Sequence, residues 1–259
     1  MKILLVGPSW VGDSVMSQSL LKVLLSQKKS IEIDVLSPKW TSSIFHRMSE
    51  VSQVILSPFE HGDIKLQERW KLGLSLRTKN YKKAIVLPNS LKSSLVPFFA
   101  KIPERVGWVG EKRYLLLNDL RNLDKVAYPR MVDRFVALAM NDKQSLPLEI
   151  PYPKLNVEKS NQKALSKRHD FKTDLPTISL CPGAEFGPAK RWPPEYFSKV
   201  ADHFLKKEWQ VIVLGSINDA PLCKQIESRL DPENTGLLFN LSGLTNIVDA
   251  IDILAFSSL

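Results

Sequence analysis

The first thirteen residues constrain the fold of this chain more than any other segment. Lys2 to Val6 form an almost uninterrupted apolar run of strand length, and residues 7–9 interrupt it. Gly12 permits a second tight bend, and a helical pattern of apolar residues begins at Asp13. The apolar residues of that pattern are Met16, Leu20, Val23 and Leu24. A buried strand, a glycine turn and an amphipathic helix are typical of a βαβ unit, in which ligands bind at the carboxyl end of the strand.

The same alternation continues through the first half of the chain. Further strands are expected at 31–36, 53–56, 83–87 and 105–108. Helical patterns lie between and after them, at 40–48, 64–76, 91–99 and 131–140. Strands that alternate with helices predict a parallel sheet covered by helices, which is an α/β fold.

A change of composition separates this half from the next. Three prolines punctuate residues 141–174, and the alternation then resumes. Strands are expected at 177–181, 211–214 and 237–239, and helices at 159–168, 197–204, 220–230 and 247–256. Two such halves predict two Rossmann-like domains that face a cleft: residues 1–150, a linker at 151–174, and residues 175–259. The second domain is expected to be incomplete, because it has three strands and the chain stops directly after an apolar helix.

Composition narrows the class of protein and its compartment. Cys181 and Cys223 are the two cysteines, too few for a disulfide framework and without metal-ligand spacing, so we expect a reducing, cytoplasmic compartment. No apolar run reaches the roughly 18 residues of a transmembrane helix. The run from Ile3 to Val6 is too short for the core of a signal peptide. The four histidines form no metal-binding pair, so no metal site is expected.

Positive charge is concentrated in one part of the chain. The net charge is +9, and residues 77–134 hold 13 Lys and Arg against 5 Asp and Glu. Such a surplus favours an anionic partner, such as nucleic acid, a phosphorylated sugar or an acidic lipid. The alternative is a solvated surface that only keeps the protein soluble, and charge by itself does not decide between them.

The segment 181–194 has the features of a phosphate-binding loop. It follows an expected strand and leads into a helix, and Gly183 and Gly187 allow the backbone to approach a ligand closely. Lys190 and Arg191 precede the helix, where the helix dipole disfavours cations. A bound phosphate would remove this conflict, because helix N-termini bind anions. Alternatively, both side chains extend into solvent.

Two further loops follow strands of the second half. In the loop 215–219, Asp219 is placed to accept hydrogen bonds from ribose hydroxyls, with Ser216 beside it. Equally, Asn218 or Asp219 could cap the next helix. The loop 240–243, which ends at Gly243, is a candidate to contact a nucleotide base.

Asp13 has two interpretations that predict different losses on substitution. As a helix N-cap it would contribute about 1 kcal/mol of stability. As a general base its removal would slow the reaction roughly 10²–10⁴-fold. Thermal stability and turnover of an Asp13→Ala variant separate the two.

Four segments together resemble a known family. They are Gly7 to Asp13, Leu87 to Ser90 with Lys92, Arg105 to Tyr114, and Cys181 to Trp192. Their residues and their order along the chain resemble glycosyltransferase family 9. The resemblance implies a GT-B fold, in which two Rossmann-like domains enclose the active site. It also implies inverting, metal-independent transfer of a heptose from ADP-L-glycero-β-D-manno-heptose to the first heptose of the lipopolysaccharide inner core, with no other cofactor.

The resemblance assigns roles to individual residues. Asp13 becomes the base that deprotonates the acceptor hydroxyl, and Lys190 neutralises the ADP leaving group. The loop from Gly183 to Gly187 supports the diphosphate. The acceptor-side candidates are Gly12, Asn89, Lys92, Arg105, Lys112 and Arg113.

The implied partner of the basic segment is the phosphate- and carboxylate-rich inner core at the cytoplasmic face of the inner membrane. We therefore expect a monomer that contacts the membrane peripherally and does not bind nucleic acid.

Two alternatives remain open from the sequence. Family members continue with a further strand and a donor-holding loop of the type Asn-Asp-Ser-Gly-Leu-Met-His, whereas this sequence stops at Leu259. A truncated relic that binds anionic glycolipid without binding ADP-sugar is therefore one alternative. A dinucleotide-dependent oxidoreductase is the other, although no G-x-G-x-x-G follows either leading strand.

Overall fold

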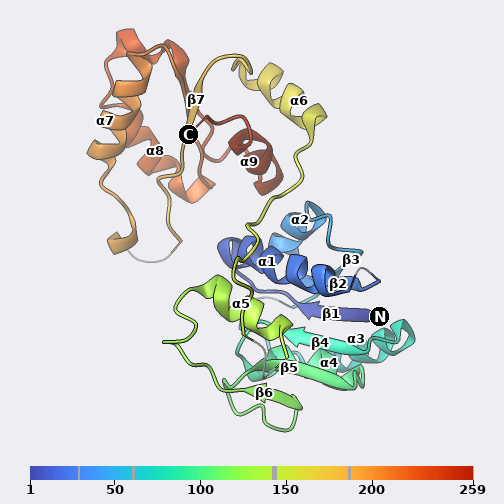
Figure 1. The fold of residues 1–259 in the computed structure, drawn as a ribbon. Coiled ribbons are helices and arrows are strands. Elements are labelled where there is room, and N and C mark those ends of the chain that lie inside the picture. The colour runs from blue at the N-terminus through green and yellow to red at the C-terminus, as the bar shows by residue number, and fades with distance from the viewer. Residues whose placement is uncertain (29, 60–61, 142–144, 186–187, 259) are drawn as a thin grey trace. The chain divides into compact units, whose positions relative to one another are not determined.

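The chain forms two compact units, Met1–Asn156 and Val157–Leu259 (Figure 1). This is a computed structural model, and it describes all residues except 29, 60–61, 142–144, 186–187 and 259. The two units are called the N-terminal unit and the C-terminal unit below. Each is built on its own parallel sheet, and each is described by itself.

The N-terminal unit has a six-stranded parallel sheet with the order β3-β2-β1-β4-β5-β6. The strands are β1 (Lys2–Val6), β2 (Glu32–Pro38), β3 (Gln53–Ser57), β4 (Lys83–Val86), β5 (Glu104–Trp108) and β6 (Asp119–Arg121). The central strand β1 is covered on both faces, and Ile3, Leu4 and Leu5 are fully buried. Burial on both faces explains why this strand appears in the sequence as a continuous apolar run.

Helices cover this sheet. They are α1 (Val11–Gln27), α2 (Lys39–His46), α3 (Leu66–Leu76), α4 (Leu95–Phe99) and α5 (Met131–Ala139), with the short 3₁₀ helices η1 (Arg77–Lys79) and η2 (Leu91–Ser94). Leu4 and Val6 share a core with Leu76 of α3 and Val96 of α4. Because side chains alternate along a strand, Ile3 and Leu5 point to the opposite face. Helix α1 packs against α5.

The C-terminal unit has a three-stranded parallel sheet with the order β7-β8-β9. Its elements are α6 (Lys159–His169), β7 (Thr177–Leu180), η3 (Pro188–Lys190), α7 (Pro194–Leu205), β8 (Gln210–Val213), η4 (Ile217–Asp219), α8 (Ala220–Glu227), η5 (Pro232–Leu237), β9 (Leu238–Asn240) and α9 (Ile247–Leu254). Val211 and Val213 pack with residues of α7 and α8, whereas Ile212 packs with Leu165 of α6 and Ile253 of α9.

Two parallel α/β units confirm the predicted fold class, and two local predictions were wrong. Strand β6 was not predicted, because three residues are too few to show a hydrophobic period. The single helix expected at 91–99 is instead η2 followed by α4. Pro97 explains the interruption, because it has no N–H to donate to the carbonyl of Ser93.

The segment 151–174, expected as a linker, is divided between the two units. Its first residues pack on the N-terminal unit. Ser19 Oγ donates to the carbonyl of Pro151 at 2.6 Å, and the backbone N–H of Asn156 donates to the backbone carbonyl of Arg47 at 2.7 Å. Helix α6 belongs to the C-terminal unit, because Asn161 Nδ2 donates to the buried Asp252 of α9 at 2.8 Å. The boundary therefore lies between Asn156 and Val157.

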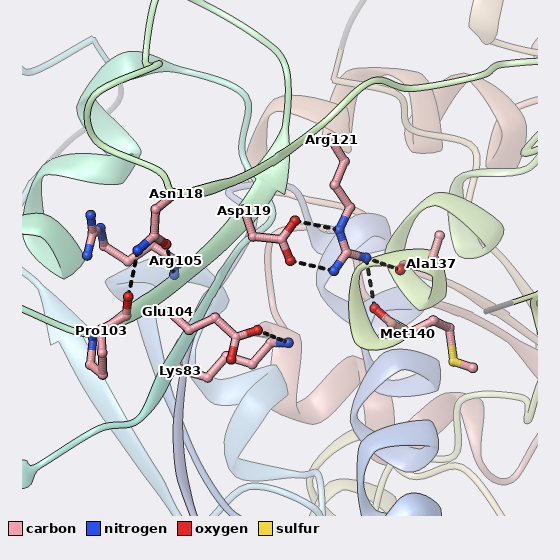
Figure 2. Close-up of polar contacts among 9 residues, drawn as sticks. All are labelled: Lys83, Pro103, Glu104, Arg105, Asn118, Asp119, Arg121, Ala137 and Met140. Carbon is pink, nitrogen blue, oxygen red and sulfur yellow. Dashed lines mark hydrogen bonds and ion pairs between the residues drawn. The ribbon is translucent and has the colours of Figure 1, made fainter. Parts of the chain in front are cut away.

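A buried arginine joins the edge of the first sheet to the end of α5 (Figure 2). Arg121 forms an ion pair with Asp119 at 2.6 Å, and its Nη1 donates to the carbonyls of Ala137 at 2.9 Å and Met140 at 2.8 Å. These carbonyls lie at the C-terminus of α5, where intrahelical donors are lacking. The hydrogen bond from Arg121 also lowers the pKa of Asp119.

The same region contains two further polar contacts (Figure 2). Asn118 accepts the N–H of Arg105 at 2.7 Å and donates to the carbonyl of Pro103 at 2.6 Å. Lys83 pairs with Glu104 at 2.6 Å. Both contacts link neighbouring strands near their amino ends.

None of the described helices is both long enough and apolar enough to span a membrane.

Arg121→Met should destabilise the protein strongly. It leaves Asp119 without its ion pair, the carbonyl of Met140 without this donor, and the carbonyl of Ala137 with only the N–H of Met140 at 3.3 Å, which together cost about 2–4 kcal/mol of the free energy of unfolding. Urea denaturation measures this loss. Lys125→Met, at an exposed position in the same connection, is the control and should change the free energy by less than about 0.5 kcal/mol. Equal stability of the two variants would contradict the role of Arg121.

Candidate functional site

Three loops of the C-terminal unit meet at the carboxyl edge of its sheet. They follow β7, β8 and β9, and the parallel direction of these strands brings them to one edge. The N–H of Gly243 donates to the carbonyl of Gly215 at 2.9 Å. A Cβ at Gly183 would overlap the carboxyl group of Asp219. Glycine is therefore required at 183 by the close approach of a loop that is 36 residues away in sequence.

Asp219 caps the short helix η4. Its Oδ2 accepts the backbone N–H of Ser216 at 2.9 Å and the Ser216 hydroxyl at 2.6 Å. Ser216 and Asp219 therefore form a capping box at η4, whereas the interpretation that Asp219 caps the following helix α8 is wrong, because its side chain makes no cap hydrogen bond there. Within the described residues Oδ1 of Asp219 accepts no hydrogen bond, so the contact with ribose stays compatible with the cap and remains a prediction.

The two cations of the candidate phosphate loop are exposed. Lys190 ends η3, and its ammonium group has no partner within the described part of the chain. Arg191 donates from Nη2 to the carbonyl of Ala184 at 3.1 Å. Both residues lie just before α7, which begins at Pro194. A site for an anion before this helix stays a prediction, and Gly187 lies outside the described residues.

Asp13 belongs to the first turn of α1. The helix begins at Val11 with Trp10 as the N-cap, two residues earlier than expected, so the N-cap interpretation of Asp13 is wrong. The Asp13 carboxylate has no hydrogen-bond or ion-pair partner among the described residues. Burial raises its pKa above the ordinary value of 3.8. A partly buried carboxylate with a raised pKa and no partner is suited to accept a proton from a substrate. The neighbouring Gly12 is exposed.

A pocket of about 90 Å³ lies at the carboxyl edge of the N-terminal sheet. Its walls come from the ends of β1, β2, β3 and β4 and from α3 and η2. The described residues of these walls are apolar residues, serines, Trp40 and two cations, Arg69 and Lys92, and none of them is acidic. We call it the cationic pocket. Asp13 is not among the residues that line it.

The two cations of this pocket differ in their surroundings. Arg69 is buried, stacks at 3.9 Å on the ring of Phe59, and donates to the carbonyls of Asp63 and Lys92 at 3.1 Å each. Burial lowers its pKa. Lys92 has no partner for its ammonium group within the described residues. The sequence analysis missed Arg69 and Trp40, because each is a single residue after a strand and belongs to no motif.

Arg113 is held inside the protein rather than at its surface. It is 1% exposed, and it donates to the carbonyls of Pro88 and Trp108 at 2.6 Å each and to the side chain of Asn89 at 3.3 Å. Burial lowers its pKa to about 10. Its geometry is that of a residue that positions the loop carrying Asn89 and Lys92.

Of the remaining acceptor-side candidates, Asn89 and Lys112 lie in loops that touch, because the N–H of Glu111 donates to the carbonyl of Asn89 at 3.2 Å, whereas Arg105 lies apart. Lys112 and Asn89 are exposed in the loops that follow β5 and β4. Arg105 lies near the amino end of β5, where Nε donates to the carbonyl of Leu116 at 2.7 Å. Arg105 therefore lies away from the carboxyl edge. Within the described ranges no three His, Cys, Asp or Glu side chains lie close enough to hold a metal ion.

The two units, each with a parallel sheet covered by helices, match the GT-B fold of solved glycosyltransferases. The chain belongs to glycosyltransferase family 9 (heptosyltransferase), whose model matches residues 69–259. This confirms the predicted family and excludes the oxidoreductase alternative.

Individual relatives cover almost all of this chain. Lipopolysaccharide heptosyltransferase 2 of Escherichia coli K12 is 45% identical over 260 residues, which are 98% of this chain and 75% of that protein. Lipooligosaccharide heptosyltransferase 2 of Haemophilus influenzae is 46% identical, with the same two shares. The solved structure of E. coli ADP-heptose LPS heptosyltransferase II matches with a TM-score of 0.90 at 42% identity, and covers 99% of this chain and 77% of that one.

Gly183→Ala should disturb the packing of the loops that follow β7 and β8. The added methyl group overlaps the Asp219 carboxyl group, which is fixed by its two hydrogen bonds to Ser216, so we expect a loss of about 1–3 kcal/mol in stability. Thermal unfolding measures the loss. Gly236→Ala in the same unit is the control, because a Cβ there meets nothing within 4 Å. Equal melting temperatures for the two variants would show that the contact with Asp219 yields freely.

Asp13→Asn should become more stable relative to the wild type as the pH rises. Because burial raises the pKa of Asp13, the native state binds the carboxyl proton more strongly than the unfolded chain does, so protonation stabilises the fold. This advantage is complete below the unfolded value of 3.8 and is lost as the pH rises through the raised native pKa. The difference in Tm, variant minus wild type, should therefore increase between about pH 4 and pH 7. A difference that decreases over this range would contradict the cause assigned to the shift.

Proposed function

We propose that this protein transfers L-glycero-D-manno-heptose from ADP-heptose to the first heptose of the lipopolysaccharide inner core, with inversion and without a metal ion. The substrates follow from the relatives, which are named for heptose transfer to lipopolysaccharide and, in the solved structure, for ADP-heptose. The chemistry rests on one observation, the Asp13 carboxylate. It lies beyond the carboxyl end of β1, has a raised pKa, and has no partner among the described residues.

The reaction needs a base at the nucleophile and positive charge at the leaving group. Asp13 takes the proton of the acceptor hydroxyl while the oxygen attacks the anomeric carbon from the side opposite the diphosphate. The bond from that carbon to the diphosphate oxygen breaks, and ADP leaves with the electron pair. Lys190, whose ammonium group has no partner within the described residues, compensates the charge that develops on ADP. The proposal requires the two side chains to face each other across the donor sugar.

The donor side of the proposal uses the C-terminal unit. Gly183 and Gly243 let the loops after β7 and β9 approach the nucleotide closely, and Arg191 adds a second cation for the diphosphate. Asp219, held by Ser216, retains an oxygen for a ribose hydroxyl.

The acceptor side uses the cationic pocket of the N-terminal unit. A volume of about 90 Å³ fits one small group rather than a whole sugar, and the two cations among the described lining residues favour a carboxylate or a phosphate. Lys92 is the direct contact, and Arg69 and Arg113 position its loop. The enzyme is proposed to act as a monomer in the cytoplasm, without nucleic acid.

Calorimetric titration with ADP, followed by mass spectrometry of a heptose-terminated acceptor incubated with ADP-heptose, tests the proposal. Asp13→Asn should slow turnover roughly 10²–10⁴-fold and leave ADP affinity unchanged. Lys190→Met should slow turnover and weaken ADP binding, each by about tenfold or more. A chelator should leave the rate unchanged.

The relic alternative predicts a different result. The wild-type chain would bind the acceptor, and would show neither ADP binding nor product.

A further inference from the structure

An apolar strip with a basic border lies on the exposed side of α3. It consists of Ile64, Leu66, Trp70 and Leu74, and we call it the α3 strip. The last three recur every four residues, so they lie along one side of the helix. Ile64 is 67% exposed, Leu66 54% and Trp70 46%, although each is a large apolar residue. A contiguous apolar strip of this kind on an otherwise polar helix indicates a contact surface.

The side of α3 next to the strip packs on the unit, since Gly73 lies only about 20° from Leu66 around the helix axis. Arg69 and Leu76 are buried, and Gly73 lies against the side chain of Phe99 in α4, with no space for a Cβ. The helix is therefore fixed on the unit by its inner side. The α3 strip borders this contact, and its residues Leu66 and Trp70 remain 54% and 46% exposed.

Positive charge accompanies the strip. Residues 63–79 contain five Lys and Arg and two acidic residues, Asp63 and Glu68, of which Asp63 pairs with Lys65 at 2.7 Å. Lys71 is exposed, and its ammonium group has no partner within the described residues. The N-terminal unit as a whole carries 24 Lys and Arg against 14 Asp and Glu, whereas the C-terminal unit has 12 against 13. The net charges are therefore +10 and −1, and the strip lies on the positive unit.

The strip also adjoins the cationic pocket. Arg69, which lines the pocket, lies beside Trp70 on α3, and its Nε donates to the carbonyl of Ile64 at 2.5 Å. Phe59, another wall of the pocket, stacks on the same guanidinium group. A surface that covered the strip would therefore lie next to the pocket.

From these observations we infer that the α3 strip docks the N-terminal unit on an anionic lipid surface. Apolar residues with tryptophan on one side of a helix and lysine at its border fit the interface of a bilayer, where tryptophan is favoured and acidic headgroups attract cations. Docking places the pocket beside the headgroups, where an acidic group of a lipid-linked acceptor is presented. The choice of a bilayer rests in part on the proposed function, because the relatives act on a lipid conjugate.

Flotation with lipid vesicles tests this inference on the full chain. The wild type should float with vesicles of phosphatidylethanolamine and phosphatidylglycerol, float less as salt increases, and not float with phosphatidylcholine alone. The double variant Leu66→Ser/Trp70→Ser should bind the anionic vesicles at least about tenfold more weakly. Lys71→Glu should also weaken binding.

A matched control separates the strip from exposed apolar residues in general. Leu115 and Val126 are 89% and 90% exposed in the same unit, and Leu115→Ser/Val126→Ser should bind vesicles like the wild type. Equal loss in both double variants, or no loss in the strip variant, would overturn the inference. So would a wild-type dimer in light scattering that the strip variant abolishes, because the strip would then bind a second copy.

The result is independent of the test of catalysis. ADP affinity and turnover on a water-soluble acceptor should be unchanged in the strip variant, since neither Leu66 nor Trp70 lines the pocket. If the wild type fails to turn over yet floats with anionic vesicles, the proposed function falls and the docking surface stands. If it turns over yet does not float, the opposite holds.

Discussion

Parallel strand pairing is the constraint on which the rest of this structure depends. Every strand in both sheets runs in the same direction as its neighbours, so the carboxyl ends of each sheet gather at one edge. In the N-terminal unit this edge collects the ends of four strands around the cationic pocket. In the C-terminal unit the same edge brings together the loops after β7, β8 and β9, which touch one another at Gly183, Gly215 and Gly243. Both candidate sites are therefore consequences of topology before they are consequences of particular side chains.

The N-terminal unit buries arginines by surrounding them with backbone carbonyls. Arg69, Arg113 and Arg121 each donate to carbonyl oxygens at the ends of helices or in loops. A buried guanidinium needs its donors satisfied, and carbonyls satisfy them without cancelling the charge. The loops that accept these hydrogen bonds are fixed in this way, and the N-terminal unit keeps its positive net charge. Arg121, with the Asp119 carboxylate as an additional partner, is the exception that serves the fold at the edge of the sheet.

The loops at the carboxyl edge of the C-terminal sheet combine closely packed glycines, a fixed carboxylate and exposed cations. Gly183 and Gly243 give close approach, and the hydrogen bonds between Ser216 and Asp219 hold one carboxylate in place. The cations Lys190 and Arg191 stand outside this packed arrangement and are exposed. A charged ligand would therefore meet a preformed backbone and adaptable cations, which is a common arrangement for diphosphate recognition.

The sequence by itself determined most of the alternation of strands and helices along the chain, with the short strand β6 missed, because hydrophobic period and glycine or proline positions are local signals. It also identified Asp13, Lys190 and Arg191 as candidate site residues in loops that follow strands. Its motifs indicated the family that the comparisons confirm. Only the tertiary structure decided which cations are exposed: Arg113 and Lys92 look alike in sequence, yet one is enclosed by carbonyls and the other lines a pocket. Tertiary structure also revealed Arg69 and the contact of Gly183 with Asp219. Such features depend on segments distant in sequence, and no local pattern records the packing that joins them.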